Sequence, residues 1–72
     1  MENIVNYLDS RVTLARRMPD LHSRKSYYSQ AFGVVEFFVS QEAEFADQLA
    51  ELWRDRYRPI FEDLCASSSS LY

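Results

Sequence analysis

The chain has 72 residues, a net charge of −3 at neutral pH, 47% apolar residues and 26% charged residues. This length allows one domain at most, and the balance of apolar and charged residues is that of a folded globular chain rather than a disordered one. Cys65 is the only cysteine and His22 the only histidine, which excludes an intrachain disulfide and a Cys/His zinc site as stabilisers. A small domain without such cross-links depends on a dense core or on oligomerisation.

The sequence gives no sign of export or of a membrane segment. The first ten residues, MENIVNYLDS, lack the basic flank and continuous apolar stretch of a signal peptide. The longest nearly apolar run covers residues 31–39, whereas a membrane-spanning helix needs roughly 20 residues. A single thiol fits a reducing compartment. We therefore expect a cytoplasmic protein with no membrane contact.

A first helix is predicted over residues 3–17. Its apolar side chains recur at helical spacing, at Val5, Leu8, Val12 and Ala15. Asn3 is a plausible N-cap, because Asn side chains accept bonds from the free backbone N–H groups of a first turn. Pro19 ends the helix and favours an extended backbone at Met18.

A second helix is expected to begin after Asp20 or after Ser23, since both residue types cap helices well, and to end near Val39. Apolar side chains occupy nearly its whole circumference, which is typical of a central helix. One line at helical spacing runs through Tyr28, Ala31, Val35 and Phe38, and Phe32 and Val39 widen it. Its segment VVEFFV also has high β propensity, but the chain offers no second strand to pair with it. Gly33 is costly in a helix; it is either tolerated in strong packing or, as we favour, marks close approach of a neighbouring helix beside Ala31.

A third helix is predicted after Ser40, which would act as its cap ahead of an acidic first turn. Apolar residues then keep helical spacing over five turns, through Ala46, Leu49, Trp53, Tyr57, Ile60 and Leu64. Pro59 interrupts this helix because it lacks the N–H that would bond the carbonyl of Asp55. The apolar spacing stays in phase beyond Pro59, which favours a kink over a break.

These elements predict an all-α fold, a three-helix up-down-up bundle whose third helix is kinked or broken near Pro59. We expect one helical domain over residues 1–65 and a loose Ser-rich tail over residues 66–72. The topology also predicts a charge dipole. Its basic end would hold Arg16, Arg17, Arg24 and Lys25, and its acidic end Glu2, Glu36, Glu42 and Glu44.

The chemistry-bearing residues do not form a catalytic pattern. The sequence lacks nucleotide-binding, nucleophile-elbow and zinc motifs. Glu44, Asp47 and Glu51 share a helical face, but carboxylate metal sites in bundles add His from the same helices, so we interpret them as a solvated face. His22 is expected in a solvated connector, and Cys65 near a helix C-terminus should be unreactive. We expect no enzyme, no cofactor and no metal.

Five Phe, five Tyr and one Trp are more aromatic side chains than three short helices are expected to cover. Because Trp, Tyr and Arg dominate binding hot spots, we predict a small non-enzymatic protein–protein interaction domain, either oligomerising or acting as an adaptor, and a homodimer or protein partner. The candidate interface residues are Tyr27, Tyr28, Val34, Phe37, Trp53 and Tyr57. The competing interpretation is that the tyrosines and Trp53 are core residues with polar tips at the rim.

The alternative function is a nucleic-acid-associated accessory or regulatory protein that uses its basic end. The possible phosphate contacts are Arg16, Arg17, Arg24 and Lys25. The net negative charge opposes this function, and no residue near the basic end is suited to reading a base edge. A weaker candidate is a basic partner bound on the acidic face of Glu42, Glu44, Asp47 and Glu51.

Overall fold

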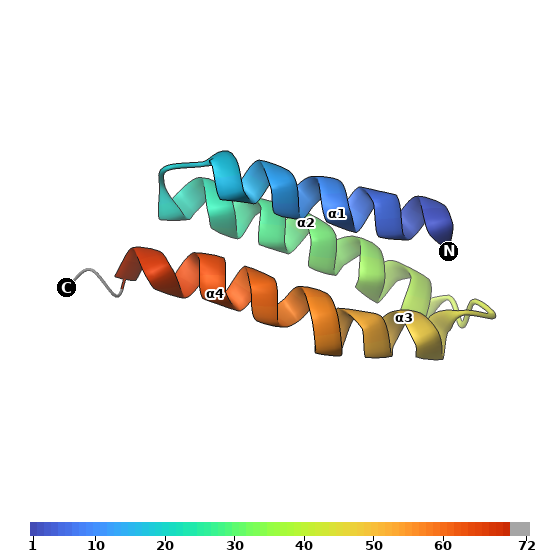
Figure 1. Ribbon diagram of the computed structural model, residues 1–72. Coiled ribbons are helices and arrows are strands. Elements are labelled where there is room, and N and C mark those ends of the chain that lie inside the picture. The colour runs from blue at the N-terminus through green and yellow to red at the C-terminus, as the bar shows by residue number, and fades with distance from the viewer. Residues whose placement is uncertain (70–72) are drawn as a thin grey trace.

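The computed structural model describes residues 1–69, and every regular element within them is helical. Helix α1 spans Glu2–Arg17, and α2 spans Leu21–Ser40. A third helix follows in three consecutive pieces: α3 (Ala46–Leu52), the π-helical turn η1 (Trp53–Tyr57) and α4 (Arg58–Ser69). The helices pack side by side into a bundle of 43 × 17 × 16 Å (Figure 1). The prediction of a small all-α three-helix bundle is confirmed.

The connection between α1 and α2 follows the local signals closely. Met18 is extended, with φ −82° and ψ 130°, as its position before Pro19 requires. The carboxylate of Asp20 caps α2 by accepting bonds of 2.9 Å from both the backbone N–H and the hydroxyl of Ser23. These bonds lower the pKa of the Asp20 carboxyl below its ordinary value. At the other end, α1 already begins at Glu2, so the prediction of Asn3 as a cap is wrong.

The connection between α2 and the third helix differs from the prediction. Ser40 is the last residue of α2, and its hydroxyl donates to the carbonyl of Phe37 at 2.8 Å. Glu42 then takes a left-handed conformation with φ 54°, and α3 begins only at Ala46. Ser40 is therefore not the cap of the third helix, because the chain reverses in a turn of residues 41–45.

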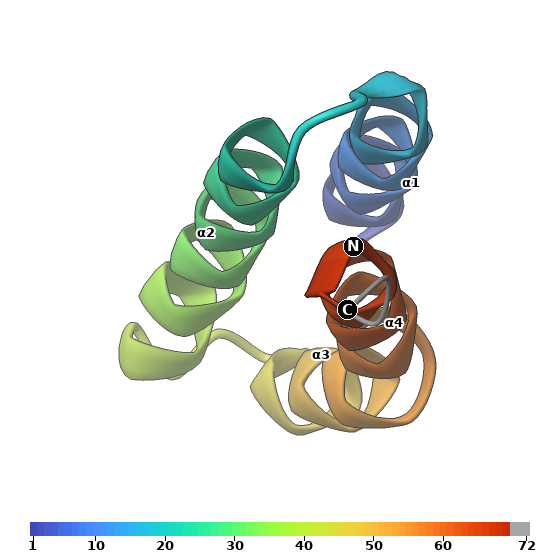
Figure 2. The same cartoon turned by 90° about the vertical axis from the view of Figure 1, so that its left-hand side faces the viewer.

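The third helix passes Pro59 without a break. The π-helical turn η1 ends at Tyr57, two residues before this proline, and the Arg58 N–H donates to the carbonyl of Trp53, five residues earlier. Arg58 keeps helical angles, with φ −56° and ψ −46°, although a following proline disfavours them. The expected irregularity thus takes the form of a π turn, a common site of helix bending. Figure 2 shows the resulting curved course of α3 and α4.

The core lies between the three helices and is apolar throughout. Its buried residues are Ile4, Leu8, Val12, Ala15, Ala31, Val35, Leu49, Trp53, Tyr57 and Phe61. Only two of these ten come from α2, although α2 is the most apolar helix. In Figure 2, α1 and the third helix lie on the same side of α2, so the opposite side of α2 faces away from the bundle.

Two further predictions concern Gly33 and the tail. Gly33 is exposed, and a Cβ added there would meet no atom within 4 Å. The described part of the single chain therefore supplies no close neighbour for Gly33, because Gly33 lies opposite the core side of α2, and the predicted close approach of another helix stays a prediction. Helix α4 extends to Ser69, and residues 70–72 lie outside the described part. The division into a domain over residues 1–65 and a tail over residues 66–72 stays a prediction.

Candidate interaction surface on the outer face of α2

The side of α2 that points away from the bundle carries large apolar side chains. We call this side the outer face. Its residues are exposed and recur at helical spacing: Ser26, Ser29, Phe32, Gly33, Glu36, Phe37, Val39 and Ser40. Phe32, Phe37 and Val39 leave 45%, 56% and 36% of their surface exposed. Among the described residues, the only other large apolar side chain so exposed is Met1. Exposed apolar surface is thus concentrated on this one helix.

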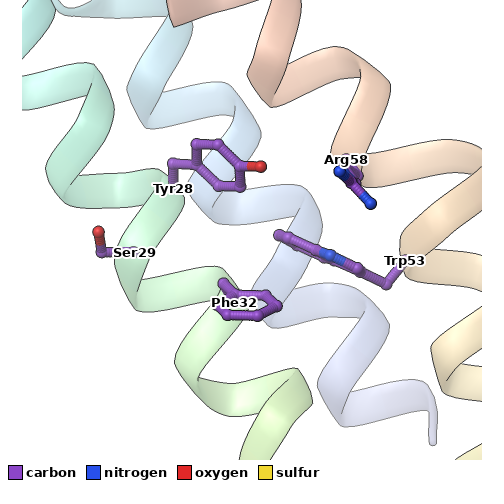
Figure 3. A pocket seen from close by; sticks show the side chains of 5 residues that line it. All are labelled: Tyr28, Ser29, Phe32, Trp53 and Arg58. Atoms are coloured by element: carbon purple, nitrogen blue, oxygen red, sulfur yellow. The ribbon is translucent and has the colours of Figure 1, made fainter.

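An aromatic groove of about 350 Å³ opens beside the outer face, between α2 and the third helix. Tyr28, Ser29 and Phe32 line it from α2, and Trp53 and Arg58 line it from the third helix. Figure 3 shows the indole of Trp53 reaching toward the rings of Tyr28 and Phe32. The centroid distances from Trp53 are 5.9 Å to Tyr28 and 5.7 Å to Phe32. Phe32 therefore belongs both to the outer face and to the groove.

The floor of this groove is fixed by buried rings. Trp53 is only 6% exposed and Phe61 is fully buried beneath it. Phe61 stacks on Tyr28 at 5.3 Å, with ring planes 5° apart, and lies 5.9 Å from Trp53. Such aromatic pairs add about 0.5–1.5 kcal/mol beyond their buried area. The groove is thus preorganised by the core, which reduces the ordering cost of binding there.

Polar and cation–π contacts close the other side of α2, where it meets α1. The guanidinium of Arg11 lies 4.9 Å from the ring centroid of Tyr7 and 5.5 Å from that of Tyr27. The same guanidinium donates to Oε1 of Gln30 at 3.0 Å. Tyr27 therefore packs on the α1 side, away from Tyr28 and Trp53. Residues 11 and 30 lie on different helices, so no sequence spacing predicts this contact.

The predicted interface residues fall into three groups. Phe37 is the most exposed large apolar side chain, whereas Val34, Tyr27 and Tyr28 are half-buried. Trp53 and Tyr57 belong to the core, but Trp53 also lines the groove beside the outer face.

The hydroxyl of Tyr57 donates to Oδ1 of Asp9 at 2.6 Å. Burial and this bond raise the pKa of Tyr57 to about 12. Tyr57 is therefore a core aromatic residue with a polar tip at the rim, in agreement with the competing interpretation of the sequence.

Phe32 and Val39 were assigned by spacing to the inward line of α2, beside Tyr28 and Val35. The structure places both on the outer face instead. The sequence signal that indicates this exposed placement is the polarity of the residues next to them on the helix surface. Ser29 precedes Phe32 by three residues and Glu36 follows it by four, and both lie on the exposed side.

The basic end is formed where α1 ends and α2 begins (Figure 1). Arg24 donates from Nε to the carbonyl of Met18 and from Nη1 to that of Leu64, both at 2.9 Å. It therefore joins the ends of all three helices. Arg16 lines a shallow hollow together with Asp63. Of the four predicted phosphate contacts, Arg24 thus has a structural role, and the assignment of phosphate contacts to the other three stays a prediction.

Within residues 1–69, no group of His, Cys, Asp and Glu side chains is placed to hold a metal ion. No helix of this described part is long and apolar enough to cross a membrane. Burial raises the pKa of the half-buried Cys65 thiol, against the opposing influence of Lys25 and Arg24.

No protein-family model, curated protein or solved structure matches the chain. Function is therefore inferred from the outer face of α2 and the groove beside it.

Proposed function

We propose that the protein is a small non-enzymatic interaction domain that binds a protein partner through the outer face of α2. The observation that carries this proposal is the exposure of Phe32, Phe37 and Val39 on one helix. Large exposed apolar patches on soluble proteins mark interaction sites, and here three large apolar side chains are exposed within about two turns of one helix. Aromatic residues are enriched and charges depleted in the cores of protein interfaces, and the outer face carries a single charged residue, Glu36, with Lys25 exposed at its flank.

The shape of the surface favours a helical segment as the bound element. Ser26, Ser29 and Gly33 are small, so the backbone of α2 is accessible between the rings of Phe32 and Phe37. An amphipathic helix of a partner can lie along this strip. The groove at Trp53 is then positioned to receive an apolar side chain from that helix, beside Phe32.

The outer face supports a function better than the basic end does. Arg24 donates to the carbonyl oxygens of Met18 and Leu64, and Arg16 lines a hollow whose lining also includes the acidic residue Asp63. Fewer cations are thus available to contact a phosphate than the sequence suggests.

A reducing, cytoplasmic location is part of the proposal, since the single cysteine has no second cysteine in its own chain with which to form a disulfide.

The test is capture of bound proteins from a cell extract on the immobilised full chain. Phe37→Ser removes the most exposed ring of the outer face, and Asn6→Ser changes an exposed residue of α1 as a control. We expect a partner, or further copies of the chain, to be retained by the wild type and by Asn6→Ser but lost with Phe37→Ser. Equal retention by all three proteins would contradict the proposal.

A further inference from the structure

We propose that the partner of the outer face is a second copy of this chain, packed antiparallel on α2 about a twofold axis at Gly33. This inference rests on the proposed function, because it names the occupant of the same surface. A twofold axis is the commonest symmetry of protein dimers, and it brings the same patch of both copies together. The outer face must therefore be complementary to itself. Its shape meets this condition, and so do two charges that flank it, Lys25 and Glu42.

The charges along α2 are arranged for antiparallel pairing. Lys25 is exposed near the start of α2, and the exposed residues Glu36 and Glu42 lie toward and just past its end. A parallel pair would set Lys25 against Lys25 and Glu36 against Glu36. In an antiparallel pair centred on Gly33, Lys25 lies at the level of Gln41 of the second copy, next to Glu42. Lys25 and Gln41 both lie about 12 Å along the helix from the axis at 1.5 Å per residue, so they stand at the same level of the dimer. The long side chain of Lys25 is then directed at Glu42, which follows Gln41 in the turn after α2.

The shape of the outer face also matches itself. Ser26, Ser29, Gln30 and Gly33 are exposed and stand at positions i, i+3, i+4 and i+7, which is the outline of a hole between helical side chains. Three of these four residues are small. In the antiparallel pair, Phe37 of one copy lies at the level of this hole in the other. The exposed ring thus enters a small-residue hole, and the twofold axis repeats the contact.

The environment of Gly33 supports the same arrangement. A glycine in the middle of a helix lowers helix stability relative to alanine, and apart from its adjacent helix backbone no atom of residues 1–69 lies within 4 Å of the position of a Cβ. The chain thus has no internal packing requirement for glycine at position 33. A second α2 on the axis supplies the close neighbour that Gly33 accommodates. Because one helix pair buries less than the roughly 1,200 Å² of strong specific interfaces, the dimer is expected to be weak and concentration-dependent.

Sedimentation equilibrium of the full chain at several concentrations, at low salt, tests this dimer. We expect a reversible dimer for the wild type, and at least about tenfold weaker association for Phe37→Ser and for Gly33→Leu. The leucine has open space in the monomer but occupies the position of the second helix in the dimer. Helix content and thermal unfolding of each variant show whether its monomer is still folded.

A charge exchange tests the antiparallel direction specifically. Lys25→Glu and Glu42→Lys should each weaken the dimer, because each sets like charges against one another across the axis. The double variant restores opposite charges at both places, so its dissociation constant should return to within about threefold of the wild-type value. Failure of the double variant to recover would overturn the antiparallel dimer.

The outcomes for the two proposals are distinguishable. A wild-type chain that stays monomeric at every concentration overturns the second-copy inference. If such a monomer still captures another protein through Phe37, the interaction function stands with a different occupant. If it captures nothing that depends on Phe37, the interaction function fails as well.

Discussion

Ala31 and Val35, on the inner side of α2, are buried between α1 and the third helix, whereas Phe32 and Phe37 on the outer face leave 45% and 56% of their surface exposed. These residues are near neighbours on the same helix and are all apolar. The apolar content of a helix therefore indicates how much of its surface should be shielded from water. It does not indicate whether the same chain or another molecule provides that shielding. The predictions below test this difference between the inner side and the outer face.

Removing a ring from the core, against which the inner side of α2 packs, should have the largest effect. Phe61 is fully buried against Tyr28 and Trp53, so Phe61→Ala is expected to cost about 3–5 kcal/mol of the free energy of unfolding. Urea unfolding followed by circular dichroism measures this cost. For a domain with only a few kcal/mol of stability, the variant should be largely unfolded. A loss below about 1 kcal/mol would show that the aromatic core is not packed as described.

A smaller loss is expected where the core is tied to α1. Tyr57→Phe keeps the buried ring but removes the 2.6 Å bond to Asp9, which should cost about 1 kcal/mol. Asp9→Ala is the matched variant, and the double variant should lose little more than either single one. Additive losses in urea unfolding would contradict a direct bond between the two side chains.

The same bond predicts a pH dependence. The pKa of Tyr57 is raised to about 12 by burial and by the bond to Asp9, whereas an unfolded tyrosine ionises near pH 10. The neutral phenol is thus favoured in the folded state. Its contribution to stability is complete below about pH 10 and disappears as the pH rises through about 12. An ultraviolet titration should show this late step in the wild type and not in Tyr57→Phe.

A gain in stability is expected on the outer face. Gly33→Ala should stabilise the monomer by roughly 0.5–1 kcal/mol, because alanine favours the helix and a methyl group there meets no neighbour. The matched change on the inner side is Ala31→Gly, which should destabilise by at least as much since Ala31 is fully buried. Thermal unfolding at low protein concentration compares the two variants. A destabilising effect of Gly33→Ala would place a neighbouring helix at Gly33 within the single chain.

The smallest effect on folding is expected for the most exposed ring. Phe37→Ser should change the free energy of unfolding by less than about 0.5 kcal/mol, as surface substitutions do. The adjacent ring of Phe38 is half-buried and packs against the core, so Phe38→Ser should cost about 2 kcal/mol or more. Chemical unfolding of both variants separates the two rings. Similar losses would make Phe37 an ordinary core residue and would remove the main support for the interaction surface.

Much of the fold followed from local signals in the sequence. Pro19 ends α1, Asp20 caps α2, and the apolar spacing continues through Pro59, because these effects depend on residues within one or two turns. The assignment of Ser40 as a cap failed because the left-handed backbone at Glu42 depends on how the chain must reverse. The π turn before Pro59 likewise reflects packing of the third helix as well as its sequence.

The candidate site was harder to predict than the fold. Phe37 is exposed, and its role at an interface stays a prediction. Phe32 and Val39 lie on the outer face although their spacing places them beside the inner line, and Trp53 and Tyr57 are buried in the core. Exposure on α2 depends on how far this helix is rotated about its axis relative to its neighbours. A helix that is apolar nearly all round has only a weak amphipathic pattern to define that rotation. The polar residues Ser29 and Glu36 were the best available guide.

Amide NMR spectra of the full chain, recorded over about two orders of magnitude in concentration, test most directly whether the outer face of α2 pairs with a second copy. At weak affinity, the signals should move smoothly as the dimer fills. We predict shifts that recur with helical period along α2, largest at Ser29, Gly33 and Phe37, and small at Ala31 and Val35. Spectra that do not change with concentration, or shifts confined to α1, would contradict pairing through this face.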